Sequence, residues 1–218
     1  MTTTDPNLPE LLVNGSKRAD LTILLAHGAG AAMDTEFMEV FAAGLADCGW
    51  RVIRFEFPYM AERRRTGKRR PPDRESILRE TWKQVIDSLK PKKKKKKLFI
   101  GGKSMGGRIA SLIADDVDVS GLVCLGYPFH PIGKPDRLRV DHLKTIQTST
   151  LILQGQRDVM GNQDEVSKYD LSRQIELCWL PDGDHSFKPR KSSGQTAKKN
   201  WRTGIEAIEA FAKSLARQ

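Results

Sequence analysis

The sequence is poor in cysteine and has no long hydrophobic run. Its three cysteines, Cys48, Cys124 and Cys178, are odd in number, widely spaced and without a C-x-x-C pair. Neither a disulfide framework nor a zinc ribbon is therefore predicted, and Cys124 and Cys178 are expected to pack in the core as small apolar side chains. No apolar run approaches the roughly 20 residues that a membrane helix needs, and the first ten residues lack the pattern of a signal peptide. We expect a folded cytoplasmic protein with no membrane partner.

Positive charge, by contrast, is abundant. Lys and Arg number 37 and Asp and Glu number 27, so the formal net charge is +10. Much of it lies in two segments, RRRTGKRR at 63–70 and KPKKKKKK at 90–97. Neither contains an aromatic residue, and no known nucleic-acid-binding pattern accompanies them, so we predict no specific nucleic-acid partner. The lysine run is interpreted as a solvated loop. The arginines at 63–70 either face the pocket and select a carboxylate or phosphate, or belong to a solvated loop; the second interpretation is favoured.

Short apolar runs alternate with amphipathic stretches along the 218 residues. Strands are predicted at 21–27, 51–57, 98–102, 119–127, 150–155 and 174–180. Helices are predicted at 35–47, at 74–89 behind the cap-like Asp73, and at 105–116, 164–169 and 201–215, with a polar loop between Pro58 and Asp73. Such alternation is typical of βαβ units. We expect one α/β domain over residues 1–218, with a mostly parallel twisted sheet of about six to seven strands and helices on both faces.

The segment GGKSMGG, residues 101–107, has two possible interpretations. A phosphate-binding loop needs a glycine five residues before Gly102, but Lys97 stands there and the loop is too short. The alternative, Gly102-x-Ser104-x-Gly106 between a predicted strand and a predicted helix, is the context of a nucleophile elbow. There a strained turn exposes the serine, and glycines allow the strand and helix to approach closely. Ser104 is the predicted nucleophile.

A serine nucleophile needs a base, and the chain has four histidines. His185, in PDGDHSF, follows the last predicted strand, where the order serine, acid, histidine calls for the base. His27 precedes the serine and better suits the loop that binds an oxyanion. His142 is interpreted as a packing residue, whereas His130, in YPFHP, is a candidate for the pocket lining.

The acid that orients His185 is expected to be Asp158, in LQGQRDVMG. It stands just past the predicted strand at 150–155, and active sites of open α/β sheets gather at the carboxyl ends of strands. Asp164 is a rival but better suits a helix start. Asp184 is adjacent to His185, and adjacent side chains on a loop rarely orient one another. Asp182 and Asp184 are interpreted as turn residues.

Backbone N–H groups are expected to stabilise the oxyanion. One is the N–H of Met105, directly after the nucleophile, and the other is that of Ala29 in AHGAGAAMD, with Gly30 as the next choice. Small residues in that loop let the backbone approach a substrate. The predicted substrate-binding residues are Gly28, Gly30, Tyr59 and His130.

Together, HGAGA, RFEFPY, GGKSMGGRIA, GYPFHPIGKPDRLR, LILQGQRD and GDHSF resemble the α/β-hydrolase superfamily in sequence and order. Within it the chain is similar to the lidless dienelactone-hydrolase-like group that contains the testis-expressed and NSL-complex-subunit-like hydrolases. The resemblance implies a triad of Ser104, Asp158 and His185, no cofactor and no metal. Dienelactone hydrolases proper use cysteine where this chain has Ser104, so their substrate is not carried over. The stretch at 126–147, with three prolines, implies an open site without a full lid.

The sequence therefore predicts a serine hydrolase that cleaves small carboxylic esters, thioesters or lactones through an acyl-enzyme. Two alternatives stay open. The fold could serve as an interaction module, because some relatives are subunits of nuclear complexes, or the enzyme could cleave short peptides. The sequence leaves the natural substrate and the oligomeric state undetermined.

Overall fold

The computed structural model describes residues 8–89 and 97–216. Within them the strands are β1 (Leu11–Asn14), β2 (Leu21–Ala26), β3 (Arg51–Phe55), β4 (Lys97–Lys103), β5 (Gly121–Leu125), β6 (Thr150–Gly155) and β7 (Ile175–Leu180). The α-helices are α1 (Glu36–Asp47), α2 (Pro58–Thr66), α3 (Glu75–Leu89), α4 (Met105–Ser111), α5 (Gln163–Val166) and α6 (Ala197–Ala216). Short 3-10 helices η1 (Ala114–Asp116), η2 (Asp141–Lys144) and η3 (Lys191–Ser193) complete the elements.

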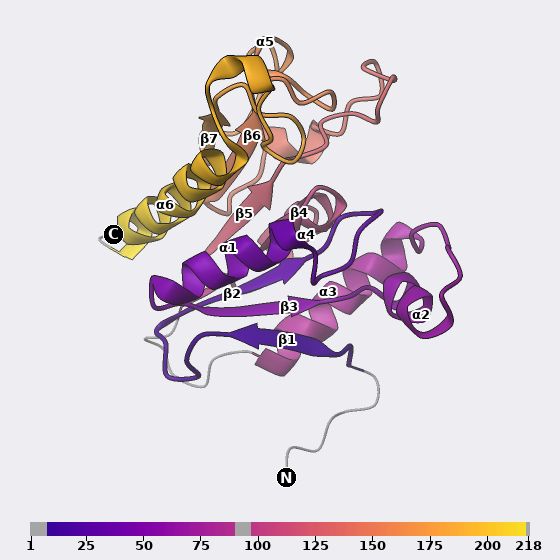
Figure 1. The fold of residues 1–218 in the computed structure, drawn as a ribbon. Helices are drawn as coiled ribbons and strands as arrows, with labels where there is room; N and C mark the ends of the chain where they lie inside the picture. Colours follow the sequence, from indigo (N-terminus) through magenta and orange to yellow (C-terminus); the bar gives the residue numbers. More distant parts are fainter. Residues whose placement is uncertain (1–7, 90–96, 217–218) are drawn as a thin grey trace.

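The strands form one sheet in the order β1-β3-β2-β4-β5-β6-β7 (Figure 1). All neighbouring pairs are parallel except β1 with β3. The predicted mostly parallel sheet is therefore confirmed, with β1 as an antiparallel edge strand that the sequence did not indicate. β1 has four residues and is only partly buried, with Val13 46% exposed, so it carries no clear apolar alternation.

Helices cover both faces of the sheet, as predicted, and each face has its own core. On β2, Ile23 and Leu25 pack with α1 and α6, whereas Leu24 and Ala26 pack with the core on the side of α3 and α4. In Figure 1, α1 and α6 cross the near face of the sheet, and α3 and α4 lie behind it. Because successive strand residues point to opposite faces, a continuous apolar run fills both cores.

The segment after Pro58 was expected to be a polar loop, and this prediction is wrong: it forms α2. Proline suits the first helical position, and the Asp73 carboxylate accepts the Tyr59 backbone N–H at 2.8 Å, which satisfies a free donor of the first turn. Asp73 therefore stabilises the start of α2. Its position in the sequence had predicted a cap for the next helix, α3, but no Asp73 side-chain hydrogen bond to α3 is present in the described residues. The helix ends at Gly67, whose φ of 71° is left-handed.

The remaining boundaries differ from the sequence expectation by a few residues. The predicted helix at 105–116 is divided into α4 and η1, and the last helix begins at Ala197. Between β5 and β6 the chain contains η2 but, in the described residues, no separate cap. Of the lysine run, only Lys97 lies within the described residues, where it begins β4; the predicted loop falls outside them. No helix in the described part of the chain is long and apolar enough to cross a membrane.

Candidate active site

Ser104 lies on the sharp turn between β4 and α4. Its φ is 51°, a left-handed conformation that is uncommon for a residue with a side chain. A Cβ added at Gly102 or Gly106 would overlap the carbonyl oxygen of Ala26 on β2. Glycine is therefore required on both sides of Ser104, because the turn presses against the neighbouring strand. The G-x-S-x-G spacing thus has the steric origin that a nucleophile elbow needs.

Asp158 and His185 are joined by a hydrogen bond of 2.7 Å between Asp158 Oδ2 and His185 Nδ1. Asp158 follows β6 and is fully buried, and its other contacts hold it in place. Oδ2 also accepts from Gln154 Nε2 at 2.9 Å, and Oδ1 accepts from the backbone N–H of Met160 at 2.9 Å. A carboxylate with three donors has one orientation, so it fixes the imidazole ring.

The other nitrogen of His185, Nε2, is enclosed and has no hydrogen-bond partner in the described part of the chain. Its ring lies beside the elbow: a Cβ added at Gly126 would be 3.5 Å from His185 Cε1, and the preceding Leu125 accepts the Ser104 backbone N–H at 3.1 Å. Within the described ranges no hydrogen bond joins Ser104 Oγ to His185. Such bonds are often long before substrate binds.

The predicted oxyanion donors share one cavity with Ser104. This cavity has a volume of about 420 Å³, and Ala29, Ser104 and Met105 contribute to its wall. In the described residues neither the Ala29 N–H nor the Met105 N–H donates to a backbone carbonyl. Both donors are therefore free to bind a negative oxygen beside the serine.

His27 and Tyr59 support the loop that carries Ala29. His27 Nε2 accepts the Phe57 backbone N–H at 3.1 Å, so its proton is on Nδ1, which donates to the Gly28 carbonyl at 2.7 Å. Burial lowers the pKa of His27 and keeps the ring neutral. The Tyr59 hydroxyl donates to the Ala29 carbonyl at 2.9 Å. This network fixes the backbone on which the Ala29 N–H is mounted.

The four predicted substrate-binding residues are not among those that line this cavity, although a Cβ added at Gly28 would be 3.7 Å from Ser104 Cβ. Tyr59 is 2% exposed and lies beneath the loop, where its hydroxyl donates to the Ala29 carbonyl. His130 is also 2% exposed, with its nitrogens 3.0 Å from the Pro131 carbonyl and 3.4 Å from Glu165 Oε2. Gly28 and Gly30 line neighbouring cavities. Their contact with substrate stays a prediction.

Lys103, the variable position before Ser104, is a residue that sequence reasoning missed. Its Nζ donates to the His185 carbonyl at 2.5 Å, which ties the histidine loop to the elbow. Burial lowers the pKa of Lys103 to about 7, although the charges of Asp158 and Asp184 oppose the change. The motif leaves this position free, so no sequence signal marked it.

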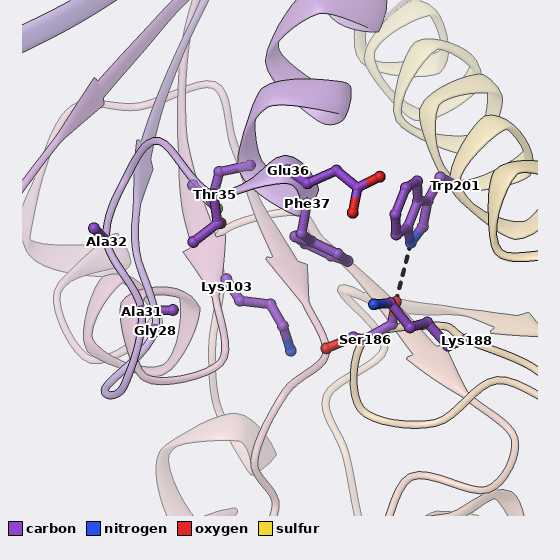
Figure 2. A pocket seen from close by; sticks show the side chains of 11 residues that line it. Gly28, Ala31, Ala32, Thr35, Glu36, Phe37, Lys103, Ser186, Lys188 and Trp201 are labelled. Carbon is purple, nitrogen blue, oxygen red and sulfur yellow. Dashed lines mark hydrogen bonds between the residues drawn. The ribbon is translucent and has the colours of Figure 1, made fainter.

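Lys103 lies in a second cavity, of about 300 Å³, on the side of α1 (Figure 2). Its side-chain nitrogen, Nζ, lies between Phe37 and Ser186 and is 5.4 Å from the centre of the Phe37 ring. The Trp201 indole N–H closes the far side by donating to the Ser186 carbonyl at 3.0 Å. The loop that carries His185 is thus held from β4 and from α6.

The arginines at 63–70 do not reach the Ser104 cavity within the described ranges. Arg64 pairs with Glu56 at 2.7 Å and with Asp34 at 2.9 Å, and with Arg63 it lines a different cavity beside α2. Two arginines that the sequence had not singled out, Arg108 and Arg139, line the Ser104 cavity instead. In the described residues no cluster of three or more His, Cys, Asp or Glu side chains is arranged to hold a metal ion.

A mostly parallel sheet with a serine on a strained strand-to-helix turn is characteristic of the α/β-hydrolase class of fold. The family model described as alpha/beta hydrolase domain matches residues 19–213. The chain therefore belongs to this family.

Solved structures of similar fold include serine hydrolases. A protein from Xanthomonas campestris, described as a serine hydrolase without lid, superposes with a TM-score of 0.71 at 16% identity, over 94% of this chain and 88% of that one. A serine hydrolase homologue from Coxiella burnetii gives 0.69 at 18% identity, over 94% and 90%. A dienelactone hydrolase from Anabaena variabilis gives 0.65 at 19% identity, over 90% and 88%. At these sequence identities, the structural similarity shows the fold of this chain and no more.

Proposed function

We propose that this protein is a serine hydrolase that cleaves small carboxylic esters, thioesters or lactones, with Ser104 as nucleophile, His185 as base and Asp158 as the orienting acid. The observation that carries the proposal is the 2.7 Å hydrogen bond from His185 to Asp158, which leaves Nε2 of His185 without a partner beside the elbow. A base so oriented has one nitrogen committed and one available for the serine proton.

In the first step, His185 Nε2 takes the proton of Ser104 as Oγ attacks the carbonyl carbon of the ester. Asp158 stabilises the imidazolium, and the N–H groups of Met105 and Ala29 bind the oxyanion that forms. Loss of one such donor typically raises a barrier by about 3 kcal/mol. Collapse of the tetrahedral intermediate breaks the bond to the leaving group, which receives the proton from His185, and leaves an acyl group on Ser104.

In the second step, water gives a proton to His185 Nε2 and attacks the acyl carbon. The second tetrahedral intermediate expels Ser104 Oγ, which regains the proton, and the carboxylic acid leaves. No cofactor takes part in this proposal. The open cavity, bounded by the proline-containing stretch after β5, favours a small or flexible acyl group.

The finer resemblance, to the testis-expressed and NSL-complex-subunit-like hydrolases, rests on YPFHP and the following GKP and stays a prediction, as does the cytoplasmic location. The resemblance is also what supports the alternative of an interaction module. A scaffold has no physical need for an oriented histidine beside a strained serine, so the enzymatic function is preferred.

Covalent labelling tests the proposal. A fluorophosphonate probe should label the native protein, and Ser104→Ala should abolish labelling. Ser214→Ala, which changes a serine on α6 whose hydroxyl bonds the Phe211 carbonyl, should leave labelling intact. A folded native protein that stays unlabelled would overturn the proposal and favour the interaction module. Rates with 4-nitrophenyl acetate and with a peptide anilide then separate an esterase from a peptidase.

A further inference from the structure

Two arginines, Arg108 and Arg139, line the cavity of Ser104. Arg108 belongs to α4, and its backbone N–H donates to the Ser104 carbonyl at 2.9 Å, so the two residues lie one helical turn apart on the same side. Arg139 comes from the stretch between β5 and β6. Two arginines therefore line the same cavity as the serine that would attack an ester.

Arg108 is only partly neutralised. Its two terminal nitrogens each lie 3.2 Å from Glu75 Oε2, and the other oxygen of Glu75 accepts from Arg79 at 2.7 Å. One carboxylate thus serves two guanidinium groups, so Glu75 neutralises only part of their combined charge.

Arg139 has no carboxylate partner among the residues that the structure describes. In the described part of the chain its guanidinium makes no hydrogen bond and no ion pair. Burial lowers its pKa, and so does the positive charge of Arg108. Its backbone, however, is fixed on both sides, because its N–H donates to the Phe129 carbonyl at 2.8 Å and its carbonyl accepts from the Tyr127 hydroxyl at 2.9 Å. A partly buried, unpaired guanidinium on a fixed backbone can bind an anion with little rearrangement.

Two carboxylates also line the wall: Glu75, which pairs with Arg108, and Asp73, whose Oδ2 accepts the Tyr59 N–H at the start of α2. Much of the rest is apolar, including Leu78, Pro128 and Met160. An apolar wall with an unpaired guanidinium suits a ligand with a short hydrocarbon segment and one negative end. Electrostatics and packing therefore favour the same kind of ligand.

We infer that the substrate carries a free carboxylate, which Arg139 binds together with Arg108 while Ser104 attacks the ester. The inference rests on the proposed function and specifies its substrate class. A guanidinium holds a carboxylate with two parallel hydrogen bonds, which fixes both the distance and the orientation of the reacting group. The carboxylate belongs either to the acyl part or to the alcohol part of the ester, and matched substrates distinguish the two.

The experiment compares esters that differ only in that charge. For the acyl part, 4-nitrophenyl hydrogen adipate is compared with 4-nitrophenyl methyl adipate. For the alcohol part, 3-acetoxybenzoate is compared with its methyl ester. The measured quantity is the ratio of kcat/KM for the acidic ester to kcat/KM for the neutral one, because effects common to both esters cancel in the ratio.

Arg139→Gln should lower this ratio about tenfold or more for one of the two pairs, since a hydrogen-bonded charge pair is lost. Arg139→Lys should retain part of the preference, because it keeps the charge but not the fork. The matched control is Arg137→Gln, an exposed arginine of the same segment, which should leave the ratio unchanged. Thermal unfolding establishes that each variant is folded.

A ratio that is the same in the native protein, Arg139→Gln and Arg137→Gln for both pairs would overturn the inference while leaving the esterase intact. If no ester is cleaved and Ser104 is not labelled, the proposed function fails separately. Calorimetry on Ser104→Ala then tests the site alone, with monomethyl adipate against dimethyl adipate for the acyl part and 3-acetoxybenzoate against its methyl ester for the alcohol part. In one of the two pairs the acidic ligand should bind more tightly, and Arg139→Gln should remove the difference. Equal binding within both pairs would also overturn the inference.

Discussion

Replacement of Asp158 by asparagine tests the proposed triad at its most buried member. The carboxylate accepts three hydrogen bonds, from His185, Gln154 and the Met160 N–H. Asparagine has the same shape but one oxygen and one NH2 group, so it cannot accept at both positions. Asp158→Asn therefore changes the chemistry of the site and leaves its volume almost unaltered.

Both orientations of the new amide are unfavourable. If its oxygen faces His185 and Gln154, its NH2 group opposes the Met160 N–H. If the amide is flipped, its NH2 group opposes His185 Nδ1–H and selects the tautomer whose Nε2 carries a proton and cannot act as a base. Opposed buried donors cost about 1–3 kcal/mol, or about 2–12 °C in Tm for a chain of this size. The lost charge and the wrong tautomer should lower kcat by up to about 10⁴-fold.

The assay measures the rate of fluorophosphonate labelling and of 4-nitrophenyl acetate hydrolysis, with Tm as the test of folding. The matched control is Asp164→Asn, because Asp164 is exposed and was the rival acid. It should keep both rates within about twofold of the native protein, as surface substitutions usually do. Asp158→Asn with native rates, or a larger loss in Asp164→Asn, would refute the assignment.

Three further predictions follow from single contacts. Gly106→Ala should lower Tm by about 2–12 °C, because its methyl group would overlap backbone oxygens of the neighbouring strand, whereas Gly30→Ala, with open space around it, should not. Tyr59→Phe should slow labelling of the serine roughly two- to tenfold, since the Ala29 carbonyl loses its donor; an unchanged rate would show that the loop needs no such support. Lys103 has a folded-state pKa near 7, below its ordinary value, so the folded protein binds fewer protons than the unfolded chain between pH 7 and pH 10. Its contribution to stability therefore rises with pH in that window, and urea unfolding at pH 7 and pH 9 should show a smaller rise for Lys103→Met; equal rises would contradict the shift.

The sequence by itself determined the features that depend on neighbours along the chain. Alternating apolar runs indicated a parallel sheet covered on both faces, and the sheet is confirmed. The glycines around Ser104 indicated a strained turn, and the turn has a φ of 51°. Local patterns are informative here because this turn brings its strand and helix so close to β2 that only glycine fits two positions before and after Ser104.

Chain order gave a second kind of information. It singled out Asp158 and His185 because each follows a strand, and their side chains are 2.7 Å apart. Their catalytic roles stay a proposal that labelling decides. The helix after Pro58 was missed because its first turn is completed by Asp73, which lies outside the helix, and its arginines are neutralised in part by acidic side chains from other segments.

Tertiary structure alone decided which side chains share a cavity. Lys103 reaches the carbonyl of a residue 82 positions away, and Arg139 lies near Arg108 although 31 residues separate them. Neither contact leaves a periodic or positional signal, because it depends on the packing of whole elements and not on the backbone preferences of the residues involved. The strained serine was therefore predictable from local sequence, whereas the charged wall proposed to select its substrate arises only when the strands and helices are assembled.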